Sequence, residues 1–94
     1  MKLIVVEAEF SSEKVSEAIR LFEAQAATVR GMEGCEHYKL FRTPDEPRIA
    51  IVQRWTSMEA FDAYRDSPVM ATLGQGLKPI MSKRPVTIVA EIED

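Results

Sequence analysis

The sequence has little of the side-chain chemistry that most metal and catalytic sites use. Its 94 residues contain one cysteine, Cys35, and one histidine, His37. One cysteine forms no disulfide within the chain, and a cysteine outside a CxxC spacing gives no metal-binding framework. Because nitrogen and sulfur ligands are so scarce, the sequence predicts no metal site within one chain.

Long apolar runs and basic stretches are also missing. The N-terminal segment has four consecutive apolar residues before Glu7, which is too few for a signal peptide or a membrane span. The net charge is −3, and Lys83-Arg84 is the only pair of adjacent basic residues. Binding sites for nucleic acid or an anionic membrane need a denser positive patch. We therefore expect a cytoplasmic protein whose partners include neither nucleic acid nor a membrane.

What is present is the composition of an ordinary globular protein. Hydrophobic residues make up 46% of the chain and charged residues 29%. A chain of this length buries roughly 60–65% of the surface that it exposes when unfolded, which is enough for one core. We expect residues 1–94 to form a single domain.

Residue periodicity predicts alternating strands and helices. The expected strands cover residues 2–10, 35–42, 48–55 and 86–92. The expected helices start after Ser11-Ser12, after Thr56 and at Pro68.

Three short signals mark the expected helix ends. Thr56-x-x-Glu59 is a capping box, and Ser67 followed by Pro68 is typical of a helix start. Gly31 lies where a left-handed residue often ends a helix.

The order of elements predicts an α+β fold. Two β-α-β halves are joined by the turn at Pro44–Pro47, as in the ferredoxin-like βαββαβ arrangement with a four-stranded antiparallel sheet. Its strand order is 4-1-3-2, with the first and third strands in the centre. Residues 3–6 and 49–52 are the most continuously apolar segments, as central strands require.

The same two segments predict a homodimer. Leu3 and Val5 point to one face of the sheet, whereas Ile4 and Val6 point to the other. Helices cover one face in this fold, and an antiparallel sheet with a wet second face has polar residues there. We expect a second copy of the sheet to cover that face. The alternative is that both-sided apolar character only reflects β-propensity.

Two segments then resemble a known family. Residues 30–40, RGMEGCEHYKL, resemble a Pro/Gly-Cys-x-x-Tyr-x-Leu segment of the antibiotic biosynthesis monooxygenase family. Residues 53–64, QRWTSMEAFDAY, followed by Asp66-Ser67-Pro68, resemble its second signature. The resemblance extends over essentially the whole chain.

The resemblance implies a dimeric α+β barrel with a pocket in each subunit between the sheet and the second-half helices. Members of this superfamily include cofactor-free quinol and polyketide monooxygenases, haem-degrading enzymes and an isomerase. Many carry histidines at the positions of Tyr64 and Val69, where this chain has neither.

The first functional hypothesis is a cofactor-independent monooxygenase, an oxidoreductase acting on a small aromatic, quinol- or polyketide-like metabolite. Molecular oxygen is the second substrate, and no metal, flavin or other cofactor is expected. The alternatives are a non-catalytic ligand-binding dimer, an isomerase, or a haem-degrading relative. Haem degradation is the least favoured alternative, because this chain has no histidine in the second-half helices to bind the haem iron.

Two residues are candidates for catalysis. His37 has the right pKa range for a general base, although it also fits a half-exposed histidine on an edge strand. Tyr64 is a candidate for orienting a substrate oxygen, although it also fits a core tyrosine.

Four further residues are candidates for substrate binding. Trp55, Phe61 and Met70 lie near Tyr64 in the expected fold and predict an apolar cavity of roughly 300 Å³ or more. Arg54 precedes Trp55 in the same expected strand and therefore points to the opposite face of the sheet. It is a candidate for binding an anionic group. Each also has an ordinary alternative: core packing for Trp55, Phe61 and Met70, and a surface ion pair for Arg54.

Overall fold

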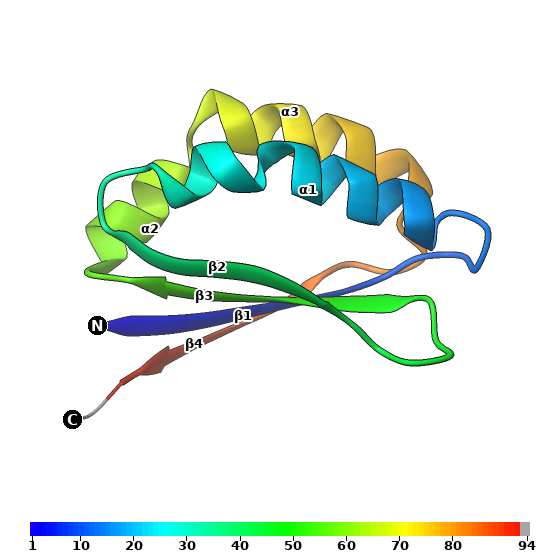
Figure 1. The fold of residues 1–94 in the computed structure, drawn as a ribbon, viewed down its shortest axis with the longest axis horizontal. Helices are drawn as coiled ribbons and strands as arrows, with labels where there is room; N and C mark the ends of the chain where they lie inside the picture. Colours follow the sequence, from blue (N-terminus) through cyan, green and yellow to red (C-terminus); the bar gives the residue numbers. More distant parts are fainter. Residues whose placement is uncertain (93–94) are drawn as a thin grey trace.

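The computed structural model describes residues 1–92. In this part of the chain, three α-helices form a layer over one face of a four-stranded sheet (Figure 1). In chain order the elements are β1 (Lys2–Glu9), α1 (Val15–Arg30), β2 (Cys35–Arg42), β3 (Arg48–Trp55), α2 (Met58–Arg65), α3 (Pro68–Leu77), a short 3-10 turn (Lys78–Ile80) and β4 (Val86–Glu91). The structure confirms the predicted ferredoxin-like α+β fold.

The sheet has the order β2-β3-β1-β4, and all neighbouring strands are antiparallel. This is the predicted 4-1-3-2 order, with β1 and β3 in the centre. Val5 of β1 lies opposite Val52 of β3 and Ile88 of β4. Partners in antiparallel strands point to the same face, so this register defines which side chains share a face.

The core lies between the sheet and the helices. One stripe of α1 is buried against β2 and α3, with apolar residues spaced by three or four positions, as an amphipathic helix requires. Phe22 belongs to this stripe, and burying a side chain of its size stabilises the fold by roughly 1.5–3 kcal/mol. From the sheet, alternate residues of β3 enter the same core: Ile49, Ile51, Gln53 and Trp55.

The helix starts agree with the sequence at α3 and differ at α2. Ser67 accepts a hydrogen bond from the Met70 amide at 3.2 Å, as predicted. At α2 the capping residue is Ser57, whose hydroxyl accepts from the Ala60 amide, and not Thr56. The Thr56 amide instead donates to the Gly34 carbonyl at 2.9 Å. This bond extends the β2–β3 pairing by one residue beyond each strand end. The N-cap of α2 is therefore one residue later than predicted.

Gly34 is the glycine that the fold requires before β2. It has φ = 85°, whereas Gly31 has φ = −84°, so the expected left-handed residue lies three positions later than predicted. A Cβ atom at Gly34 would lie 2.5 Å from the Ala60 Cβ. The turn therefore passes directly against α2, and an L side chain is excluded both by backbone conformation and by space.

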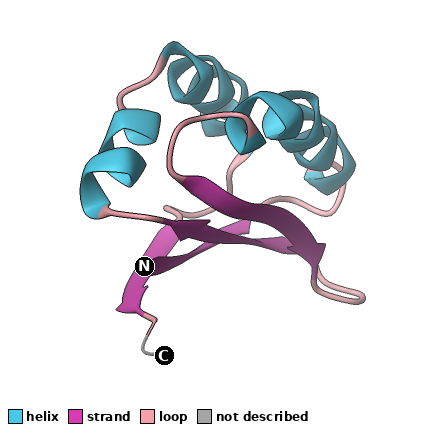
Figure 2. Ribbon diagram, turned by 60° about the vertical axis from the view of Figure 1, so that its left-hand side comes forward, coloured by secondary structure: helices cyan, strands magenta, loops and turns pink. Residues whose placement is uncertain are grey.

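The other face of the sheet has no covering element among residues 1–92 (Figure 2). We call it the open face. The register places Leu3, Val5, Phe41, Val52 and Ile88 on it. Phe41 is 45% exposed and Ile88 49% exposed, although both are large apolar residues.

Candidate functional site

A cavity of about 230 Å³ lies between the sheet and the helices, and we call it the helix-side cavity. It is walled by α1, by α2 and α3, by the central strands, and by the segment that leads into β4. Most of the lining residues are apolar: Val6, Ala8, Phe22, Ile51, Phe61, Met70, Leu77, Met81 and Pro85. Five polar residues complete it: Tyr38, Gln53, Tyr64, Arg65 and Thr87.

The two tyrosines of the protein meet in this cavity. Their hydroxyl oxygens are 3.3 Å apart and form a hydrogen bond, and their rings pack edge to face. Tyr38 comes from β2 and Tyr64 from α2, and both side chains are buried. The pair therefore joins the edge strand to the second-half helices inside the cavity.

Burial keeps both phenols neutral. Loss of hydration raises the pKa of Tyr38 above its usual value, and repulsion between ionised Tyr38 and Tyr64 acts in the same direction. Burial likewise raises the pKa of Tyr64, although its hydrogen bond with Tyr38 acts in the opposite direction. A phenol with a pKa above 10 is a hydrogen-bond donor at neutral pH and a poor general base.

Gln53 adds a second kind of donor. Its Oε1 atom accepts a hydrogen bond of 2.9 Å from the Trp55 indole, and its side chain is 2% exposed. This bond assigns the amide orientation, because the indole N–H only donates. The Gln53 NH₂ group has no protein acceptor among the hydrogen bonds of residues 1–92, and Gln53 lines the cavity. It is thus a donor available to a ligand.

Trp55 does not line the cavity, contrary to the sequence-based expectation. Its side chain is fully buried and stacks on the Tyr64 ring with centroids 5.3 Å apart. Tyr64 therefore lies against the indole, and Trp55 supports the cavity wall. The expected volume of 300 Å³ was also too large.

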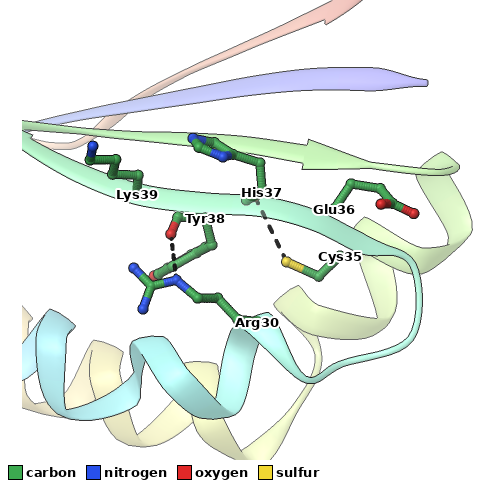
Figure 3. A pocket seen from close by; sticks show the side chains of 6 residues that line it. All are labelled: Arg30, Cys35, Glu36, His37, Tyr38 and Lys39. Atoms are coloured by element: carbon green, nitrogen blue, oxygen red, sulfur yellow. Dashed lines mark hydrogen bonds between the residues drawn. The ribbon is translucent and has the colours of Figure 1, made fainter.

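His37 and Arg54 lie on the open face. The register pairs them with each other, while the neighbouring pair, Tyr38 and Gln53, faces the helices. Figure 3 shows His37 and Lys39 on the side of β2 away from α1, with Tyr38 on the other side. The structure therefore separates His37 from Tyr64, and the sheet lies between the imidazole and the helix-side cavity.

A surface depression of about 260 Å³ borders β2 (Figure 3). Arg30 and Lys39 belong to its walls, and the Arg30 Nε donates to the Tyr38 carbonyl at 2.9 Å. Cys35 also lines it, and burial raises the pKa of the thiol. A raised pKa makes the thiol a weaker nucleophile at neutral pH, and half of the lining residues are charged, so this depression is a weaker candidate than the helix-side cavity, despite its larger volume.

No cluster of three or more His, Cys, Asp or Glu side chains within residues 1–92 is arranged to hold a metal ion. No helix in the same range has the length and apolar character needed to cross a membrane.

Sequence comparison decides the family. The model of the antibiotic biosynthesis monooxygenase family matches residues 1–73, most of the chain. The chain belongs to this family. No curated protein sequence matches it.

Several solved structures, two of them described as antibiotic biosynthesis monooxygenases, share the fold. A crystal structure of an antibiotic biosynthesis monooxygenase has a TM-score of 0.92 at 14% identity, with both chains covered completely. A candidate antibiotic biosynthesis monooxygenase from Caulobacter crescentus has a TM-score of 0.93 at 22% identity, covering 99% of this chain and 90% of its own. Rv0793 from Mycobacterium tuberculosis has a TM-score of 0.86 at 21% identity, covering 100% and 97%. At these identities the likeness establishes the fold.

Sequence reasoning missed four polar residues of this family member's cavity: Tyr38, Gln53, Arg65 and Thr87. Gln53 carried a readable signal, since it shares strand parity with Ile49 and Ile51 and is therefore a polar residue on the buried side of a central strand. Tyr38 and Arg65 had no comparable signal. Phe61, Tyr64 and Met70 do lie around the cavity, and their roles toward a substrate stay predictions.

Proposed function

We propose that this protein is a cofactor-independent monooxygenase of a small aromatic, quinol-like metabolite. The observation that carries the proposal is the helix-side cavity, in which the Tyr38 and Tyr64 hydroxyls meet within apolar walls. The family membership supports the reaction class. A cavity of roughly 150 Å³ accommodates one benzene molecule, so 230 Å³ favours a substrate with one or two rings over a larger polyketide.

The reaction needs no redox group from the protein. A quinol anion gives one electron to O₂, the resulting radicals combine to a ring hydroperoxide, and loss of water leaves a new carbonyl. For 1,4-naphthalenediol the balance is C₁₀H₈O₂ + O₂ → C₁₀H₆O₃ + H₂O. The protein's part is to hold the substrate in a dry site and to orient it. Tyr64 and Tyr38 suit this part, because neutral hydroxyls donate to a substrate oxygen.

The test is oxygen-isotope incorporation with 1,4-naphthalenediol under ¹⁸O₂. Monooxygenation yields 2-hydroxy-1,4-naphthoquinone carrying one ¹⁸O atom, whereas uncatalysed oxidation yields 1,4-naphthoquinone and hydrogen peroxide. We expect Tyr64→Phe to slow the enzymatic product by about tenfold, since it removes one hydrogen bond. A rate equal to that of buffer alone, across one- and two-ring quinols, would remove the proposal.

The same assay separates the two catalytic assignments. Because His37 faces away from the cavity, we expect His37→Ala to retain most of the activity. A loss of several orders of magnitude in His37→Ala, with Tyr64→Phe unaffected, would return the role of base to the histidine.

The proposed assembly is a homodimer through the open face. Val52, Val5 and Ile88 are neighbours across β3, β1 and β4 and form an apolar strip on this face, and such surfaces on soluble proteins mark interaction sites. A second copy of the same sheet is the simplest cover.

Sedimentation tests the dimer. We expect twice the mass of one chain at micromolar concentration, and a monomer for Val52→Lys, which places a charge in the centre of the open face. Ala24→Lys is the matched control, because Ala24 is exposed on α1. A monomeric wild-type protein, or a dimer unaffected by Val52→Lys, would exclude this interface.

A second function also has a supporting observation. Of the described residues lining the cavity, none is a carboxylate, a histidine or a lysine, the side chains that commonly accept a proton. This favours a non-catalytic ligand-binding dimer as the alternative. Binding of a quinol without ¹⁸O incorporation would select it.

A further inference from the structure

Arg65 is the one charged residue among the described residues that line the helix-side cavity. It is the last residue of α2, one position after Tyr64. The guanidinium lies over the Phe61 ring, 5.3 Å from the ring centroid. This contact holds the charge beside an apolar wall.

The guanidinium has no strong partner in the described part of the chain. Its Nη1 atom is 3.9 Å from the Asp62 carboxylate, and both side chains are 56% exposed. Ion pairs of this kind between exposed groups contribute little. The flat fork of N–H donors that binds oxyanions is therefore available to a ligand at the cavity mouth.

The other polar groups of the cavity are donors as well. Tyr38 and Tyr64 are neutral phenols that share one hydrogen bond, which leaves one hydroxyl hydrogen of the pair for a ligand. The Gln53 NH₂ group has no protein acceptor among residues 1–92. A site made of donors and one cation is complementary to a ligand rich in acceptor oxygens and carrying negative charge.

We propose that Arg65 makes the cavity selective for one- or two-ring aromatic oxyanions, with the guanidinium as their counter-ion and Tyr64, Tyr38 and Gln53 as donors to their oxygens. The inference deepens the proposed monooxygenase function and rests on it for the identity of the cavity as the substrate site. A preference for the anion also removes the need for a base in the cavity, because the quinol binds after it has lost its proton.

The experiment compares two ligands that differ in charge and share their rings. 2-Hydroxy-1,4-naphthoquinone is ionised at neutral pH, whereas 2-methoxy-1,4-naphthoquinone has no proton to lose. Isothermal titration calorimetry at low ionic strength measures both. We expect the wild-type protein to bind the hydroxy compound at least tenfold more tightly, and added salt to reduce this preference.

Three variants assign the preference to a residue. Arg65→Gln should lose about tenfold in affinity for the hydroxy compound and bind the methoxy compound as before. Arg65→Lys should retain part of the preference, because it keeps the charge without the flat fork. Arg20→Gln is the control, since Arg20 is exposed on α1 and away from the cavity; it makes the same change in net charge and should bind as the wild type.

The outcomes separate the two proposals. Equal affinity for both compounds, or an unchanged preference in Arg65→Gln, would overturn the role of Arg65 while leaving an aromatic site in place. Equal losses in Arg20→Gln and Arg65→Gln would assign the effect to net charge and would also overturn it. If neither compound bound the wild-type protein, the cavity would not be the substrate site, and the proposed function would fail together with this inference.

Discussion

The hydrogen bond between Tyr38 and Tyr64 is expected to couple the edge strand to α2 in a measurable way. Both hydroxyls are buried, and each is the other's partner at 3.3 Å. This separation is longer than the 2.7–2.8 Å typical of O–H···O bonds. We therefore expect each single change, Tyr38→Phe or Tyr64→Phe, to lower the free energy of unfolding by about 1 kcal/mol.

The double variant gives the sharper expectation. Removing both hydroxyls leaves no unpaired polar group, so its loss should be about 1–1.5 kcal/mol and not the sum of the two single losses. The coupling energy of the cycle is then about 0.5–1 kcal/mol. For a domain of this size, 1 kcal/mol corresponds to roughly 4–8 °C in the melting temperature.

Urea unfolding followed by tryptophan fluorescence is the assay. Trp55 is the only tryptophan and stacks on Tyr64, so its emission reports directly on this part of the core. All variants are compared at one protein concentration, because association changes apparent stability. Single losses that add to within about 0.3 kcal/mol would show that the hydroxyls are not coupled, and the assignment of the pair as one unit would be refuted.

Two further predictions concern stability. Gly34→Ala should lower the free energy of unfolding by about 2 kcal/mol or more, because it combines an unfavourable left-handed backbone with a Cβ only 2.5 Å from the Ala60 Cβ. Gly74→Ala is the contrasting variant: it lies inside α3 with open space at the Cβ position, so a gain of about 0.5–1 kcal/mol is expected in the same urea titration. Burial raises the pKa of Tyr38 and Tyr64 in the folded state, so stability is retained below pH 10 and falls above it, by at most about 1.4 kcal/mol per pH unit for each tyrosine that stays protonated in the fold. The double Phe variant should lose this part of the alkaline destabilisation, and an unchanged pH profile in that variant would contradict the raised pKa values.

The sequence alone determined the elements and their topology. Apolar spacing of three or four residues outlined α1, and the prolines at Pro44 and Pro47 separated β2 from β3. These signals are local, because helix and strand periodicities and proline geometry act over a few residues. The strand order followed from the two β-α-β halves and from the apolar character of the central segments.

Tertiary structure decided which functional side chains meet. Cys35 and Tyr38 are three residues apart and would lie on opposite faces of a regular strand. The register shift between Cys35 and His37 places both on the helix side and leaves His37 on the open face. Nothing in the local sequence specifies that bulge.

The cavity itself also depended on packing between distant elements. Trp55 is buried in the core and stacks on Tyr64, so its ring supports the cavity wall and does not line the cavity. Arg65 of α2 lines the same cavity as Leu77 of α3 and Thr87 of β4, residues that are distant in the sequence. Sequence periodicity specifies which face of an element is buried, whereas the neighbours that a side chain meets on that face depend on how separate elements pack together.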